Sequence, residues 1–355
     1  HLSIRRQRQM CIRDRYEMLP KLGGMLRYGI PNYRLPKERL DDDIQAILDT
    51  GVKVDCGKAI GKDYSIVDLK EKYDAVLITI GASTDKKLGL EGEDAKGVIS
   101  AVQFLRDVGY GTQESLEGKE VAVIGGGNVS MDAVRTSVRL GAKKVSIVYR
   151  RRVADMTALP DEILGAEAEG VEIKTLMAPS RIEKDEEGNV KGIWVTPQMI
   201  SNIKGGRASV KPTGEDDVFI PCQTLIVAIG QDIEYQHFEE AGVPVQRGKI
   251  NVEKFGGFEE MPGVFAGGDC ATGPSTVISA IAAGKVIAAN IDEYLGYHHE
   301  ITADVEIPEP KLEDKPACGR VNLTEREAGE RVKDFEGVEN CMTAVSYTHL
   351  TLPTN

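Results

Sequence analysis

The sequence predicts an α/β fold in which parallel strands are covered by helices. Three observations support this prediction. Residues 120–149 read as a strand, a glycine turn, a helix and a second strand. An apolar strand within 75–80 is followed by a glycine, and another within 262–269 ends at two glycines. The chain has 355 residues, which is too long for one ordinary core and suggests about two domains.

The glycine turn has the spacing of a dinucleotide-binding motif. Gly125, Gly127 and Ser130 occupy the three positions of G-x-G-x-x-(G/A/S), between an apolar strand and an amphipathic helix. The first glycine permits a tight turn, and the second lets the backbone at Asn128 and Val129 approach a pyrophosphate at the positive helix end. Glycine turns also join strands to helices without a ligand, but the complete order of elements here favours nucleotide binding.

Three arginines follow the second strand, Val145–Tyr149. At this position an NAD-binding unit usually carries an acid for the ribose hydroxyls, whereas an NADP-binding unit carries arginine for the 2′-phosphate. Arg150 and Arg151 are therefore candidate ligands of that phosphate, and Arg152 completes the run. A short basic run is also commonly a solvated edge. Its position favours NADP(H) and leaves NAD(H) possible.

Composition and charge exclude several classes of function. The net charge is −12 and aromatic residues make up 5% of the chain, which argues against nucleic-acid binding. No apolar run approaches the ~18 residues that span a bilayer, so we expect no membrane association. Six cysteines are scattered without a C-x-x-C pair, which favours free thiols in the cytoplasm. The adjacent His298 and His299 would point apart, so no metal site is expected.

Both ends of the chain differ from the rest. Residues 1–15 contain five arginines, and residues 345–355 read VSYTHLTLPTN. Neither stretch has the periodicity of an element or the features of a targeting signal. Both resemble translated library-adapter sequence. We therefore expect them to lie outside the fold, which would span residues 16–344.

A family resemblance rests on several motifs in a fixed order. These are LGGMLRYGIP from residue 22, the IGA turn at 80–82, VIGGGNVSMDAVRTSVRLGA from 123, YRR followed by ALPDE, VAIGQ at 227–231, and FAGGDCATGPSTVISAIAAGK from 265. With these motifs in this order, the chain resembles the NADPH-dependent glutamate synthase small-chain (beta subunit) family of FAD/NAD(P)-dependent oxidoreductases. The resemblance covers about residues 16–344.

The resemblance implies two dinucleotide-binding, Rossmann-like, three-layer domains, with the NAD(P) domain inserted into the FAD domain. It implies FAD-binding segments at 16–107 and 230–300, an NAD(P)-binding domain at 108–229 and a tail at 301–344. The first flavin motif of the family, G-x-G-x-x-G ahead of Glu17, is missing. We therefore expect the FAD domain to be incomplete.

The resemblance also implies roles for individual residues. Glu17 would accept hydrogen bonds from the adenosine ribose of FAD, and Gly23, Gly24 and Met25 would lie beside the isoalloxazine. Asp269, after Gly268, would bind the ribityl chain, although such an aspartate also occurs as a helix N-cap. The remaining implied cofactor contacts are Gly81, Gly230, Gln231 and the helix that begins near Thr276.

Further strands are expected at 171–176, 193–196 and 224–229, with a helix at 159–170 and hairpin turns at 184–189 and 203–217. The family lines its nicotinamide site with the segment at 159–170, where Glu162 is a candidate contact, although a glutamate in a first helical turn ordinarily serves the helix dipole.

The implied activity is hydride transfer from NADPH to FAD and onward transfer to iron–sulfur clusters. No side-chain acid or base is needed, so no catalytic residue is assigned. The clusters are expected only in segments outside this chain or in a partner, which would be an electron-accepting catalytic subunit or a ferredoxin-like protein. Two alternatives are a disulfide reductase of the thioredoxin-reductase type, disfavoured because the chain lacks C-x-x-C, and a non-catalytic nucleotide-binding scaffold subunit.

Overall fold

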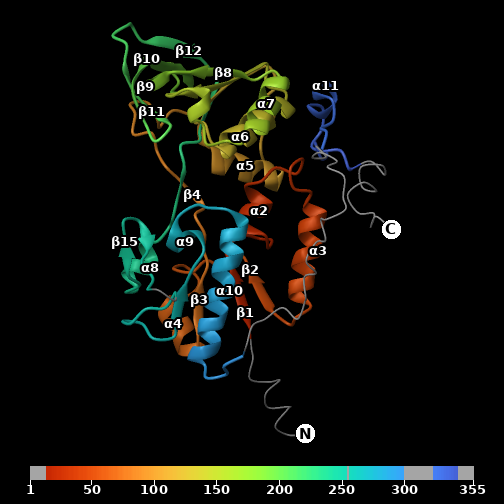
Figure 1. Ribbon diagram of the computed structural model, residues 1–355, viewed down its shortest axis with the longest axis vertical. Helices are drawn as coiled ribbons and strands as arrows, with labels where there is room; N and C mark the ends of the chain where they lie inside the picture. The colour runs from red at the N-terminus through yellow and green to blue at the C-terminus, as the bar shows by residue number, and fades with distance from the viewer. Residues whose placement is uncertain (1–12, 254–255, 300–322, 343–355) are drawn as a thin grey trace, which may run out of the picture.

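The structure is a computed structural model that describes residues 13–253, 256–299 and 323–342. Two groups of parallel strands lie one above the other along the long axis of the molecule (Figure 1). The chain passes between them at β4 (Thr84–Asp85) and β14 (Gln231–Asp232), which pair antiparallel. The predicted α/β class with two Rossmann-like domains is confirmed.

The upper unit is built on a five-stranded parallel sheet. Its order is β5 (Val98–Ser100), β13 (Thr224–Val227), β6 (Glu120–Ile124), β7 (Lys144–Tyr149) and β8 (Glu172–Thr175). One face packs against the helices α5 (Ala101–Tyr110), α6 (Asn128–Arg139) and α7 (Pro160–Ala168). In β6, Val121 and Val123 join that helical cluster, whereas Ala122 and Ile124 join a cluster on the opposite face. Both faces are covered, which explains the continuous apolar run of this strand.

The opposite face is covered by an antiparallel sheet inserted after β8. It consists of β9 (Met177–Lys184), β10 (Val190–Lys204), β11 (Arg207–Pro212) and β12 (Val218–Pro221). The predicted turn at 184–189 joins β9 to β10. The predicted turn at 203–217 is wrong in extent, because β10 continues to Lys204 and β11 pairs with it immediately after Gly205 and Gly206. Most residues of β11 are polar or exposed, so the segment has no apolar run to mark a strand.

The lower unit contains two parallel strand pairs. β1 (Asp14–Glu17) pairs with β2 (Lys53–Cys56), and β3 (Val76–Ile78) pairs with β17 (Val264–Ala266). Its core joins β3 and β17 to α4 (Ile66–Lys72) and α8 (Gln236–Glu240). The other elements are α3 (Lys37–Leu48), the hairpin β15 (Val245–Gln246) and β16 (Lys249–Ile250), α9 (Asp269–Thr272) and α10 (Val277–Tyr294).

Two short helices lie beside the upper unit (Figure 1). The first is α2 (Gly24–Tyr28), which packs on α5 through the rings of Tyr28 and Tyr110, with centroids 4.8 Å apart. The second is α11 (Ala328–Arg331), whose Arg331 is buried against Glu169 at the end of α7. No helix in the described ranges is long and apolar enough to cross a membrane.

Three expected boundaries differ from the structure. The boundary at residue 108 falls after β5 and inside α5, yet β5 pairs with β13 and therefore belongs to the upper sheet. Asp14 and Arg15, expected outside the fold, form the first half of β1. Part of the tail at 301–344 packs onto the upper unit through α11. Residues 1–12 and 343–355 lie outside the described residues.

Candidate nucleotide and flavin sites

The turn between β6 and α6 is held by close backbone contacts. Gly125 has φ +147°, and a Cβ there would lie 2.2 Å from the carbonyl oxygen of Ala228, which follows the neighbouring strand β13. Ser130 Oγ accepts a hydrogen bond from Gly127 N at 3.4 Å and lies 3.5 Å from the same carbonyl. Glycine is thus required at 125 by the crossing of two backbones.

This turn lies at a switch point of the sheet. β6 continues through α6 to β7 on one side, while its other neighbour, β13, comes from much later in the chain. Parallel sheets leave a ligand-binding crevice at such a point, at the carboxyl ends of the strands. The N–H groups at Asn128 and Val129 begin α6, where a helix leaves its backbone donors without internal partners. Asn128 is exposed and Val129 is half-buried, so the position fits a bound phosphate.

The start of α7 is fastened to the same turn. Thr157 N and Ala158 N donate to the carbonyl of Gly126 at 2.9 and 3.1 Å. Leu159 N donates to Asn128 Oδ1 at 3.0 Å. The ends of α6 and α7 are therefore positioned together.

The three arginines after β7 have different partners. Arg151 Nε donates to the carbonyl of Ala208 on β11 at 3.0 Å. Arg152 binds both carboxylate oxygens of Asp155, at 2.8 and 2.9 Å, and this bond lowers the pKa of Asp155. Arg150 is exposed and makes no hydrogen bond or ion pair to any described residue. Of the two predicted phosphate ligands, Arg150 is thus the one whose whole guanidinium is available.

In the lower unit, the pairing of β3 with β17 brings two predicted glycines to one edge. Gly81 (φ +69°) and Gly268 (φ +74°) both follow strands that run in the same direction. A Cβ at either position would meet nothing within 4 Å. Both the left-handed backbone and the open space favour glycine, and they leave room for a cofactor to approach the backbone. This cradle fits a flavin dinucleotide.

Asp269 and Thr276 begin the two helices that follow. Asp269 is half-buried at the start of α9, and its carboxylate accepts no hydrogen bond from the described residues, so it does not serve as an N-cap. Thr276 caps α10, accepting from Ser279 N at 3.3 Å. The predicted helix start near Thr276 is confirmed, and Asp269 is available to a ligand.

The remaining predicted residues fall into two places. Gln231 Nε2 lies 3.7 Å from Met25 Sδ, so α2 meets the crossover at β14, next to Gly230. Gly23 and Gly24 form the start of α2. Glu17 ends β1, and its carboxylate accepts from Leu19 N at 3.1 Å. Within the described residues, no hydrogen bond joins Glu17 to any other predicted site residue.

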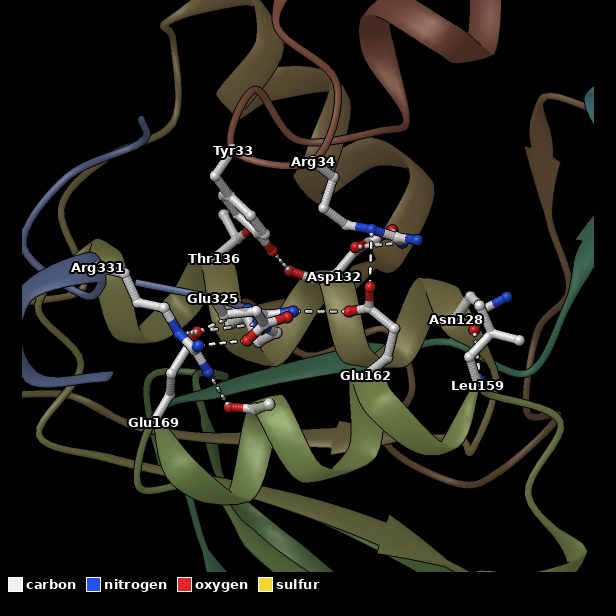
Figure 2. A network of polar contacts seen from close by, with 12 residues as sticks. Tyr33, Arg34, Asn128, Asp132, Thr136, Leu159, Glu162, Glu169, Glu325 and Arg331 are labelled. Carbon is white, nitrogen blue, oxygen red and sulfur yellow. Dashed lines mark hydrogen bonds and ion pairs between the residues drawn. The ribbon is translucent and has the colours of Figure 1, made fainter. Parts of the chain in front are cut away.

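A buried ionic network lies along α6, and the sequence analysis missed it (Figure 2). Arg34 binds Asp132 at 2.9 Å and Glu162 at 3.1 Å. Arg135 binds Glu162 at 2.7 Å and Glu169 at 2.8 Å. Glu162, which the sequence offered as a nicotinamide contact, is bound by two arginines, Arg34 and Arg135. The charges on α6 recur at helical spacing, but nothing in that pattern distinguishes a buried network from a solvated face.

Burial changes the pKa values of the acids in this network. Burial raises the pKa of Asp132 to about 6, although the positive charge of Arg34 opposes this effect. For Glu169, burial also acts to raise the pKa, but hydrogen bonds from Arg139 and Arg135 outweigh it and the pKa is lowered. Asp132 therefore titrates near pH 6, whereas Glu169 stays ionised.

Comparison with known proteins identifies the family of this chain. A family model described as pyridine nucleotide-disulphide oxidoreductase matches residues 7–284. The chain belongs to this family. A putative glutamate synthase [NADPH] small chain of Cereibacter sphaeroides is 31% identical over 315 residues, covering 83% of this chain and 73% of that protein. FAD and NADP(H), expected from the sequence, are the cofactors of this family.

Two further relatives are longer than this chain. The NADP(+)-dependent formate dehydrogenase subunit beta of Moorella thermoacetica is 38% identical over 339 residues, covering 91% of this chain and 48% of that protein. The glutamate synthase [NADPH] small chain of Escherichia coli K12 is 33% identical over 296 residues, covering 79% and 63%. The chain thus spans about half the length of the first curated relatives it matches.

Two solved structures have a fold similar to that of this chain. FprA of Mycobacterium tuberculosis in complex with NADPH superposes with a TM-score of 0.67 at 20% identity, covering 80% of this chain and 77% of that chain. Thioredoxin reductase of T. acidophilum superposes with a TM-score of 0.57 at 19% identity, covering 78% and 88%.

Proposed function

We propose that this chain is the flavin- and NADP(H)-binding part of an electron-transfer oxidoreductase subunit. It would take a hydride from NADPH and pass electrons to iron–sulfur clusters in another segment or a partner subunit. The observation that carries the proposal is the presence of two glycine-lined edges, at Gly125–Val129 and at Gly81 with Gly268, on two sheets of one chain. Family membership and relatives named as NADPH- or NADP-linked subunits support it.

The upper unit would bind the nicotinamide dinucleotide. The first turn of α6 offers backbone donors and a positive helix end to the pyrophosphate. Arg150, exposed at the end of β7, would bind the 2′-phosphate through its planar guanidinium, with Arg151 beside it. The preference for NADPH over NADH would therefore depend mainly on Arg150.

The lower unit would hold FAD. Gly81 and Gly268 leave space for close backbone approach, and Asp269 offers a carboxylate without a protein partner among the described residues. Met25 and Gln231 would lie on the side that faces the upper unit. Bound flavin supplies the two-electron chemistry that accepts hydride, so the residues need only bind, orient and exclude water.

The cysteines do not favour disulfide exchange. Burial raises the pKa of Cys222 to about 12 and also raises that of Cys270, which disfavours the reactive thiolate. Within the described ranges no two cysteines form a disulfide. We therefore place the electron acceptor outside these residues, in a catalytic subunit or a ferredoxin-like partner.

The test is an anaerobic titration of the full-length subunit that contains this chain. We expect flavin absorbance at about 450 nm to bleach on addition of NADPH, and far less readily on addition of NADH. A purified protein without flavin, or flavin that NADPH does not reduce, would refute the proposal.

A further inference from the structure

Three consecutive residues after α2, Asn32 to Arg34, bond to distant parts of the chain. Figure 2 shows Tyr33 and Arg34 reaching α6. Asn32 Nδ2 donates to the carbonyl of Phe335 in the C-terminal segment at 3.1 Å. Tyr33 is buried, and its hydroxyl donates to the carbonyl of Asp132 at 3.3 Å. Arg34 binds both carboxylate oxygens of Asp132, at 2.9 and 3.1 Å. One short segment is thus attached to α6 and to the chain's C-terminal region.

The partners of Arg34 lie one helical turn from the glycine turn. Asp132 follows Asn128 by four residues, so the two share a face of α6. Glu162 lies in the first turn of α7, whose N-cap, Leu159, is bonded to Asn128. Arg34 therefore joins the beginnings of both helices that form the candidate nucleotide site.

The same segment leads back to the candidate flavin side. Arg34 follows Met25 closely in sequence, and Met25 contacts Gln231 at the crossover. The carbonyls of Leu26 and Ile30, which lie between these two residues, accept hydrogen bonds from Lys37 Nζ at 2.8 and 2.5 Å, and these bonds hold the segment in shape. A displacement of Arg34 would thus be transmitted to α2.

The chemistry of this contact requires arginine. Nη1 faces Asp132 while Nε faces Glu162, so one planar group spans two carboxylates on two helices. Glu162 uses its other oxygen for Arg135. A lysine ammonium is a point charge and would hold only one of the two acids well.

We propose that Arg34 is a positioning residue, which fixes the flavin-side segment around Met25 relative to the nucleotide turn at 125–129. The proposal rests on the proposed function. Hydride transfer depends steeply on the placement of the reacting atoms, so a misplacement of about 1 Å can cost about 100-fold in rate. Arg34 touches neither predicted ligand position and would act through α6, α7 and α2.

The experiment compares Arg34→Gln, Arg34→Lys and the control Arg181→Gln in the full-length, flavin-loaded subunit. Arg181 is an exposed arginine on β9 that stacks on Trp194 at 4.5 Å, so its loss removes a guanidinium far from α6. Three quantities are measured: flavin content, the dissociation constant of NADP⁺, and the single-turnover rate of flavin reduction by NADPH. Amide hydrogen exchange of residues 30–35 and 128–132 is followed in parallel.

For Arg34→Gln we expect unchanged flavin content, a dissociation constant within about threefold, and a reduction rate at least about tenfold lower. Exchange at 30–35 should become faster, Arg34→Lys should lie between wild type and Arg34→Gln, and Arg181→Gln should match wild type. If Arg34→Gln does not fold, Arg34→Lys carries the same comparison.

Two outcomes overturn the inference alone. They are an unchanged reduction rate in a variant whose 30–35 segment exchanges faster, and a rate loss explained entirely by weaker NADP⁺ binding. A wild-type subunit whose flavin NADPH does not reduce refutes instead the proposed function, and the inference with it.

Discussion

Arg135 on α6 and Glu169 at the end of α7 form an ion pair in which neither side chain has exposed surface, with Nη2 and Oε1 2.8 Å apart. The same carboxylate binds Arg139 at 2.6 Å and Arg331 at 2.7 Å. One acid therefore holds three arginines, two from α6 and one from α11 in the C-terminal segment. Its loss would leave several buried positive charges without a partner.

We predict that Glu169→Gln lowers the free energy of unfolding by about 3–5 kcal/mol, since breaking a buried pair strands the remaining charges. Urea unfolding measures this. Glu172→Gln is the matched control, because Glu172 pairs with Lys144 and Lys174 at the surface and its loss should cost less than about 1 kcal/mol. Equal effects of the two substitutions would contradict the account of the network.

Arg150→Ala should weaken NADP⁺ binding by about 10- to 100-fold and leave NAD⁺ binding nearly unchanged, because only NADP⁺ carries the 2′-phosphate. Arg151→Ala should have a smaller effect, since Arg151 is partly engaged by Ala208 on β11. Dissociation constants from fluorescence titration test both. If Arg150→Ala weakened binding of the two nucleotides equally, Arg150 would not contact the phosphate.

Substitutions at the two glycines of the turn should have different effects. At Gly127 a Cβ would lie 3.4 Å from Thr157 Oγ1, so Gly127→Val should fold but place its methyl groups at the start of α6 and abolish NADP⁺ binding. At Gly125 a Cβ would collide with the Ala228 carbonyl, so Gly125→Ala should lower stability itself. Thermal unfolding and nucleotide titration separate the two effects, and a reversed pattern would show that the turn is assigned wrongly.

The pH dependence of stability should reveal Asp132. Its pKa is about 6 in the folded chain, above the ordinary value of 3.8. Between about pH 4 and 6 the unfolded chain ionises this group while the folded chain keeps the proton, so the unfolding free energy falls as pH rises through this window. Asp132→Asn should remove that part of the slope, as measured by urea unfolding at several pH values.

The charged and titratable groups that face Asp132 are Tyr33, Arg34 and Lys37 from the segment after α2, Arg135 on α6 and Glu162 on α7. Of these, Arg34 lowers the pKa of Asp132 by charge and by hydrogen bonding. Arg34→Gln should therefore raise the pKa of Asp132 in the folded chain and extend the upper end of the window to higher pH. A slope unchanged by both substitutions would show that another group is responsible.

Much of the fold could be read from the sequence because it follows periodicity and glycine spacing. The strand at 120–124, the helix after Gly127 and the helix from Val277 lie where the patterns predict. The alternation of Val121 and Val123 with Ala122 and Ile124 across β6 explains why a fully apolar run is a strand here. Local pattern was sufficient where both faces of an element are buried.

The remaining parts of the fold and of the site could not be predicted, because they depend on contacts between residues far apart in the sequence. β5 has only three residues, all half-buried, and nothing local indicates that it pairs with β13 more than 120 positions later in the chain. The network around Glu169 combines residues from α6, α7 and α11, so no sequence window contains it. Glu162 looked like a helix-dipole residue because its partners, Arg34 and Arg135, come from elsewhere.

The central claim is that NADPH on the turn at Gly125–Val129 reduces flavin held at the edge of β3 and β17. The most direct measurement is the rate at which NADPH bleaches the flavin in the full-length subunit, with wild type and Gly127→Val compared at equal flavin content. The account predicts rapid bleaching of the wild type and a rate lower by about 100-fold or more in the variant. Equal bleaching of the two proteins would contradict it.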